Sequence, residues 1–323
     1  MVEFYKSKLN RDEQNIYGQI YRAVCAQRSN LTVQTSLGAN VFQGIFESVL
    51  HDHPEQYNIS PQLSMAYQNN SYTLEFIYLY NAAEQKKINT EIENFKINLL
   101  REGNKTLLDR ELQVAHDIVM LSDYMIDNMY NQNIASVLFN HRAQCSGFAR
   151  TFQFAMNILG VWCTYVAGYA ADPQTGIRSP HAWNIVCFDN QYYHVDTTAM
   201  LGANFQKKEP LLYYHINCSD ETKARDGCYS WDRAFYPVCS RDMEAVGSKT
   251  FSRLYDLNQY FAECLKKRET SCNFILNIPQ YDSNKLSQMI MSIITDQVNN
   301  CQIRVNVKIE ARQSKFHVTL TYY

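Results

Sequence analysis

The first hundred residues carry a mainly helical pattern of apolar and polar positions. Residues 41–50 have apolar side chains at helical spacing, and residues 72–80 alternate with the period of a half-buried strand. Helical spacing returns over residues 88–99, and Gly103 is a typical helix terminator. Residues 1–104 are therefore predicted to form a separate N-terminal region of helices with one strand.

The last part of the chain, residues 246–323, has the pattern of a small module of its own. Residues 273–278 are expected to form a strand, and residues 286–294 place their apolar side chains on one helical face. Residues 303–309 and 316–322 both alternate between apolar and polar side chains. The predicted order is strand, helix, strand, strand. The module contains no chemical motif and is interpreted as a scaffold or a recognition surface.

Between these regions, a cysteine stands at the start of a predicted buried helix. Phe148, Phe152, Ala155 and Leu159 recur at helical spacing directly after Cys145. The unpaired amides at a helix start favour a negative charge, so a thiol there can lose its proton more easily than usual. The thiolate is the reactive form, and the same amides can hold an oxyanion. Cys145 is therefore a candidate nucleophile.

A predicted β-hairpin supplies the partners for this thiol. Two β-prone runs flank Asp189-Asn190, and a two-residue turn there pairs residues whose numbers add up to 379. His181 then lies diagonally from Asp196 on the same face of the hairpin, close enough for one hydrogen bond. The hypothesis is that His181 takes the proton of Cys145 and that Asp196 orients the imidazole.

Several other side chains are weaker candidates for the same site. His194 shares the hairpin face and is the rival base, although His181 is preferred because it stands at the open end of the strand. Gln144, Trp183 and Asn184 are candidates for substrate or oxyanion contacts, with a solvated side chain as the alternative for Gln144.

A helix expected from residue 108 towards Met129 carries a further histidine and carboxylate. These are His116 and Asp117, and they are interpreted as packing or capping residues rather than catalysts. The helix would lead into the central region, residues 105–245.

Composition narrows the possible functions. The 323 residues carry a net charge of −2, which argues against nucleic acid as a partner. Ten cysteines occur without any Cys-x-x-Cys pair, so no metal or other cofactor is expected, although Cys218, Cys228 and Cys239 could pair in an exported protein. No apolar run approaches the length of a transmembrane helix. The sequence as it stands suggests a cytoplasmic protein, while a removed export signal would leave the same picture.

The central motifs resemble those of the bacterial transglutaminase-like family. The matching segments are Cys145-Ser146-Gly147-Phe148-Ala149, His181-Ala182-Trp183-Asn184 and Tyr193-His194-Val195-Asp196-Thr197-Thr198. The resemblance implies an α+β, papain-like core over residues 105–245, in which a cysteine-bearing helix packs on an antiparallel sheet with the histidine and aspartate. It also implies acyl transfer through a thioester on an amide of a protein or peptide. Gln144 before the cysteine and Ala199-Met200 after the aspartate depart from the family pattern and leave the substrate subsite open.

The resemblance leaves the reaction undecided among peptidase, deamidase and transglutaminase chemistry. The alternatives are a binding or scaffold module that has lost activity, and an acyltransferase that uses a carrier thioester. The presence of cysteine, histidine and aspartate together argues against the inactive alternative. The sequence does not indicate the oligomeric state.

Overall fold

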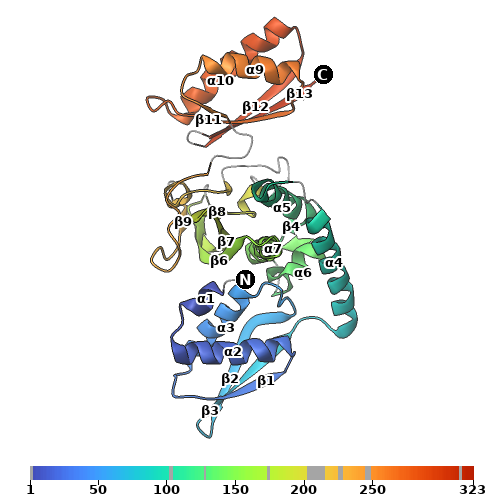
Figure 1. The fold of residues 1–323 in the computed structure, drawn as a ribbon, viewed down its shortest axis with the longest axis vertical. Coiled ribbons are helices and arrows are strands. Elements are labelled where there is room, and N and C mark those ends of the chain that lie inside the picture. Colours follow the sequence, from blue (N-terminus) through green and yellow to red (C-terminus); the bar gives the residue numbers. More distant parts are fainter. Residues whose placement is uncertain are drawn as a thin grey trace. The chain divides into compact units, whose positions relative to one another are not determined.

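The structure is a computed structural model that describes residues 3–101, 105–126, 129–172, 175–201, 215–224, 228–243, 249–312 and 315–323. The chain divides into two compact units (Figure 1). The first contains Met1–Leu211 and Cys218–Asp242, and the second contains Leu212–Asn217 and Met243–Tyr323. Gly103, the predicted helix terminator, lies outside the described residues. Residues 212–214, which belong to the expected core over residues 105–245, also lie outside them. None of the described helices is long and apolar enough to cross a membrane.

The N-terminal region of the first unit contains a three-stranded antiparallel sheet in the order β1-β3-β2. Its elements are α1 (Phe4–Ser7), α2 (Arg11–Cys25), β1 (Asn30–Gln34), α3 (Asn40–Asp52), β2 (Ile59–Gln68) and β3 (Ser71–Tyr78). Buried side chains of α2, α3 and β3 form its core. The prediction of a single strand was wrong. Apolar residues do stand at alternate positions in β1 and β2, although most side chains of both strands are exposed, and the two strands pair on either side of β3.

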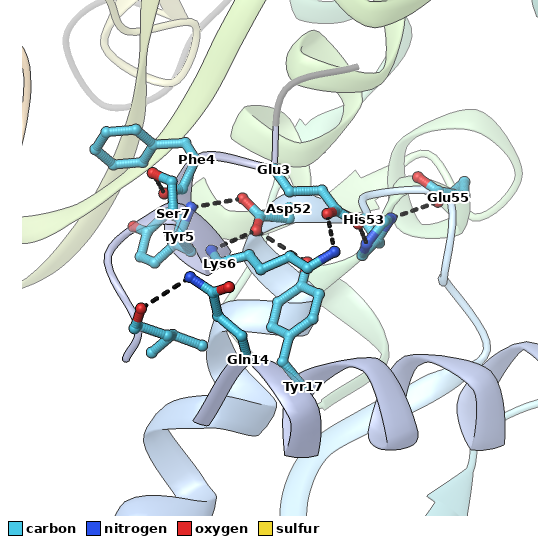
Figure 2. Close-up of polar contacts among 11 residues, drawn as sticks. Glu3, Phe4, Tyr5, Lys6, Ser7, Gln14, Tyr17, Asp52, His53 and Glu55 are labelled. Atoms are coloured by element: carbon cyan, nitrogen blue, oxygen red, sulfur yellow. Dashed lines mark hydrogen bonds and ion pairs between the residues drawn. The ribbon is translucent and has the colours of Figure 1, made fainter. Parts of the chain in front are cut away.

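A buried carboxylate attaches the first helix to this region (Figure 2). Asp52, at the end of α3, accepts hydrogen bonds from the backbone amides of Tyr5 and Lys6 and from the Tyr17 hydroxyl, at 2.9–3.0 Å. The Tyr5 hydroxyl in turn donates to the backbone oxygen of Tyr165 in the central sheet, 3.0 Å away. Asp52 therefore fixes the short helix that joins the N-terminal region to the central one.

Helices surround the start of the central region. They are α4 (Ala82–Arg101), α5 (Leu107–Leu121), η1 (Met129–Gln132), α6 (Ile134–Leu138) and α7 (Cys145–Ile158), with the short parallel strands β4 (Asp123–Tyr124) and β5 (Arg142–Ala143). Helix α5 begins with a capping box in which Thr106 and Asp109 bond each other's backbone amides. It ends at Leu121, so the expected continuation towards Met129 was wrong. Strand β4 follows at once and pairs with the strand just before Cys145.

The central sheet is antiparallel, with the strand order β8-β7-β6-β9. Its strands are β6 (Trp162–Ala171), β7 (Arg178–Phe188), β8 (Gln191–Val195) and β9 (Tyr229–Ser230). Two short helices, η2 (Ala199–Leu201) and α8 (Asp220–Ala224), lie between β8 and β9 in the chain. The predicted hairpin register is confirmed, since Phe188 pairs with Gln191 and Asn184 with Val195. Asp189 and Asn190 both have positive φ, at 50° and 60°, as a two-residue turn of this type requires. The buried face of α7 packs against β6 and β7.

The second unit is a four-stranded sheet in the order β10-β11-β13-β12, with two helices on one face (Figure 1). Its elements are β10 (Lys249–Phe251), α9 (Asp256–Lys266), β11 (Ser271–Leu276), α10 (Ser283–Cys301), β12 (Val305–Arg312) and β13 (Lys315–Tyr322). The expected strand, helix, strand, strand order is present from β11 onwards. Helix α9 was not anticipated, although Leu257, Phe261, Cys264 and Leu265 are spaced as one buried helical face.

Candidate active site

Cys145 is the first residue of α7, as the sequence predicts. Gln144 precedes it in an extended conformation as the N-cap, and its side chain makes no capping hydrogen bond. Gly147 lets the helix start approach α6 and η1 closely, because a β-carbon there would come within 2.9 Å of the Asn131 backbone oxygen. Close packing therefore explains why the third residue of the Cys-Ser-Gly motif is a glycine. The half-buried thiol stands at the amide end of a helix whose body is buried.

Strand β7 and the end of β8 bring a histidine and an aspartate together. His181 Nε2 lies 3.0 Å from Asp196 Oδ2. The Asp196 side chain is fully buried, and its other oxygen accepts the amide of Ala199, 3.0 Å away. His181 in β7 pairs with Gly168 in the neighbouring strand β6. A β-carbon at Gly168 would collide with the Trp183 ring, so this position needs glycine. The diagonal contact expected from the hairpin register is thus present.

The thiol and the imidazole perturb each other's protonation. Burial alone would raise the pKa of the Cys145 thiol, but the hydrogen bond and charge of His181, with the Ala182 amide, hold that pKa below its ordinary value. Burial acts to lower the pKa of His181, and the charge and hydrogen bond of Asp196 overcome it, so the pKa rises to about 9. A thiol pKa below its ordinary value and an imidazole pKa above its own both move the equilibrium towards a thiolate–imidazolium pair.

Lys223, on α8, is a member of this cluster that the sequence did not reveal. Its Nζ lies 2.7 Å from Asp196 Oδ2, and its side chain is only 3% exposed. The ammonium also lies over the ring of Tyr229, 3.7 Å from the centroid. Lys223 follows Asp196 by 27 residues, in a segment of mixed charge with no periodic pattern. Only the path of the chain after β8 brings the two together.

Tyr124, on β4, is a second residue near the site that the sequence reading missed. Burial raises the pKa of its phenol to about 12, and the charges of Cys145 and Asp196 add to the increase. The strand that carries Tyr124 pairs with β5, which ends two residues before the cysteine. A neutral phenol is therefore held beside the thiol and the carboxylate.

His194 occupies a separate, fully buried position. Its Nδ1 accepts a hydrogen bond from the indole of Trp183 at 2.9 Å, and its Nε2 lies 2.8 Å from Asp220 Oδ1. Burial lowers the pKa of His194 despite the nearby Asp220. These contacts make His194 a support for Trp183, whose ring stacks 5.9 Å from that of His181. Asn184 is also buried, and its amide donates to the Thr164 backbone oxygen.

Two groups of side chains within the described residues have the composition of a metal site. In the first, His194, Asp220 and Cys239 converge. Because the indole N–H of Trp183 donates to Nδ1 of His194, Nε2 carries the proton and has no lone pair for a metal.

The second group is Cys264, Glu269 and Cys272 in the second unit. The hydrogen bond with Cys264 and burial raise the pKa of Cys272, which disfavours the thiolate that a metal requires. All ten cysteines are free thiols, so Cys218, Cys228 and Cys239 are not paired in this structure.

The first unit therefore presents a thiol, an imidazole and a carboxylate at the junction of a helix start and an antiparallel sheet. Residues 100–197 match the family described as Transglut_core, the Transglutaminase-like superfamily. The matched segment contains Cys145, His181 and Asp196, and the similarity to this family is a similarity of that segment. Comparison with the curated proteins gives no match.

Three solved structures show distant similarity. A protein described as a TGase is 15% identical, with a TM-score of 0.32 over 54% of this chain and 52% of its own. A protein from Cytophaga hutchinsonii, described as a cysteine protease by inference, is 12% identical, with a TM-score of 0.29 over 42% of this chain and 61% of its own. A protein from Parabacteroides distasonis, described as a protease by inference, is 8% identical, with a TM-score of 0.29 over 80% and 61%. The chain thus spans between half and two thirds of the length of these proteins.

Proposed function

We propose that this protein is a cysteine-dependent acyl-transfer enzyme that acts on an amide bond of a protein or peptide. Cys145 is the nucleophile, His181 the general base and acid, and Asp196 the residue that orients the imidazole. The observation that carries the proposal is the arrangement in which His181 Nε2 contacts the buried Asp196 carboxylate at 3.0 Å while Cys145 stands at the start of α7. The lowered pKa of Cys145 and the raised pKa of His181 agree with this arrangement. The superfamily match over residues 100–197 supports the same chemistry.

The proposed reaction begins with the Cys145 sulfur attacking the amide carbonyl. The carbon–sulfur bond forms, the carbonyl oxygen becomes negative, and the first amides of α7 are suited to hold that charge. The carbon–nitrogen bond then breaks as the His181 imidazolium gives its proton to the leaving amine. A thioester on Cys145 and a neutral imidazole remain. Water or an amine then attacks the thioester while His181 takes its proton, which regenerates the thiolate.

We further infer that the arrangement is papain-like, with residues 105–245 as the catalytic domain between an N-terminal region and a C-terminal module. A cysteine-bearing helix packed on a sheet that carries the histidine and aspartate supports this assignment. The Tyr5 hydroxyl, bonded to the backbone of Tyr165 in β6, ties the N-terminal region to the proposed domain.

Selective alkylation tests the nucleophile. Brief treatment with iodoacetamide at pH 7, followed by peptide mass mapping, should label Cys145 faster than any other cysteine. Cys25 and Cys301 are matched controls because both are exposed whereas Cys145 is half-buried, so faster labelling of Cys145 reflects activation and not access. A peptide substrate should then leave an acyl mass on Cys145. Labelling of Cys145 no faster than that of Cys25 would contradict the proposal.

A further inference from the structure

We propose that Lys223 is a fourth member of the site, a positioning residue that acts through Asp196 to set the pH range in which the Cys145–His181 pair is reactive. The inference rests on the proposed function and deepens it. It concerns a charge that the Cys–His–Asp chemistry does not itself require, and it predicts a change that loss of structure alone would not produce.

The geometry places Lys223 and His181 on the same carboxylate oxygen. Asp196 Oδ2 lies 2.7 Å from Lys223 Nζ and 3.0 Å from His181 Nε2. The other oxygen accepts the Ala199 amide, so the carboxylate is held from three sides. A rotation of Asp196 that kept His181 would break the contact with Lys223, and the lysine therefore fixes the carboxylate in the orientation that His181 uses.

Burial strengthens the electrostatic interaction between Lys223 and Asp196. Asp196 is fully buried and Lys223 is 3% exposed, and a lysine this buried is rare unless it is paired. Its ammonium lies between aromatic faces, 3.7 Å from the centroid of Tyr229 and 5.1 Å from that of Trp183. Solvent screens such a charge weakly, so it acts on its neighbours more strongly than a surface lysine does.

The charge of Lys223 keeps the cluster neutral through the proposed reaction. In the resting state a thiolate, an imidazolium, a carboxylate and an ammonium add up to zero. In the acyl-enzyme, the thioester and the neutral imidazole carry no charge, and Asp196 and Lys223 again cancel. Without Lys223, the buried site would hold one uncompensated negative charge in both states, which is costly in a poorly solvated position.

The histidine and the two phenols that face these residues stay neutral in the working range. Near Lys223, burial lowers the pKa of His194, which is paired with Asp220, and the lysine charge adds to that effect. Near Cys145, burial raises the pKa of Tyr124 and of Tyr165 to about 12. The reactive groups left to titrate between weak acid and weak base are Cys145 and His181.

The sign of the effect follows from the positive charge. Lys223 favours the Cys145 thiolate and disfavours the His181 imidazolium, so it lowers the pKa of both groups. Replacing it with a neutral residue should therefore raise both pKa values together. The pH at which Cys145 becomes reactive and the pH at which turnover is lost should both move upwards.

The test measures Cys145 alkylation by iodoacetamide against pH in the full chain. In Lys223→Met, the midpoint of the acid limb should rise by about one pH unit, which is the lower end of the range of pKa shifts that a neighbouring charge produces. The alkylation rate below the midpoint should fall about tenfold. Lys223→Gln should show the same shift if Lys223→Met folds poorly. Lys223→Arg, which keeps the charge, should restore the wild-type midpoint.

A control variant tests whether the shift is specific to Lys223, and the proposed function and the role of Lys223 would fail in different ways. Lys87→Met removes the same charge from an exposed position on α4 and should leave the midpoint unchanged. If wild-type Cys145 has no acid limb below that of an ordinary thiol, the proposed function fails. If the wild-type limb is present but neither neutral variant moves it, or both lower the rate equally at every pH, the role of Lys223 is overturned while the nucleophile stands.

Discussion

The first unit contains two buried aspartates whose surroundings differ in kind. Asp52 and Asp196 are 2% and 0% exposed, and each accepts several hydrogen bonds. Asp52 receives them from two backbone amides and a tyrosine hydroxyl, which do not change charge near neutral pH (Figure 2). Asp196 receives them from a histidine, a lysine and one amide. A carboxylate held by neutral donors fixes the chain, whereas one held by titratable groups also controls their protonation.

The two regions consequently depend on pH in different windows. Burial raises the pKa of Asp52 from its ordinary 3.8, against the opposing effect of its donors. The folded state therefore binds this proton more tightly than the unfolded state, and the associated stability is present below 3.8 and lost as pH rises through the raised value. The pKa of His181 is raised from 6.5 to about 9 by Asp196 against burial. The stability that His181 contributes is fully present below pH 6.5 and is lost as pH rises through about 9.

The largest expected effect comes from removing the sulfur at the helix start. Cys145→Ala should lower acyl transfer by about 10⁴-fold or more, because no neighbouring side chain replaces the nucleophile. The melting temperature should change little, since the change removes one atom from a half-buried position. Turnover of a confirmed peptide substrate and thermal melting are measured on the same preparation. Full biological activity in a stable Cys145→Ala protein would show that the protein works by binding.

The two aspartates themselves provide the next comparison. Asp196→Asn should lower the turnover rate strongly, by about 10⁴-fold if it acts as the comparable change in a serine protease triad does. Asp52→Asn is the matched control, because it makes the same change at an equally buried carboxylate outside the site, and should leave the turnover number of the folded protein nearly unchanged. Equal losses of turnover in both variants would mean that Asp196 acts only through stability.

The sequence indicated the proposed site better than it indicated the residues around it. The hairpin register followed from the Asp189-Asn190 turn and from alternation with period two, which are local signals. The position of Cys145 followed from the apolar spacing behind it. Lys223 and Tyr124 could not be found in this way, since each reaches the site through pairing or a chain path that no local pattern records.

The strands that were missed are a different case. In β2, apolar residues stand at alternate positions from Ile59 to Tyr67, but only the first two side chains are buried and the outer half is exposed. Its Pro61 also argues against a strand in a sequence reading, although proline is accepted near the start of an edge strand, as here. Pairing with β3 stabilises this strand, and pairing is not visible in local periodicity.

A stability effect of intermediate size is expected in the N-terminal region. Asp52→Ala leaves the amides of Tyr5 and Lys6 and the hydroxyl of Tyr17 without their acceptor. The expected loss is about 2–4 kcal/mol in the free energy of unfolding, because buried donors are costly when unpaired. Urea denaturation followed by intrinsic fluorescence measures it. Retention of wild-type stability would show that solvent replaces the carboxylate and that Asp52 does not fix α1.

The smallest expected effect is the alkaline limit of turnover. The imidazolium of His181 must give a proton to the leaving group, so turnover should fall about tenfold per pH unit above a midpoint near pH 9. Because Asp196 raises the pKa of His181, Asp196→Asn should move that midpoint to lower pH in addition to reducing the maximum rate. Asp52→Asn should leave the midpoint in place, since Asp52 makes its contacts with α1 and Tyr17 rather than with His181. The profiles are measured as kcat/KM against pH for the three proteins. A midpoint that is the same in all three would mean that His181 does not set the alkaline limit, and the assignment of the general acid would then have to change.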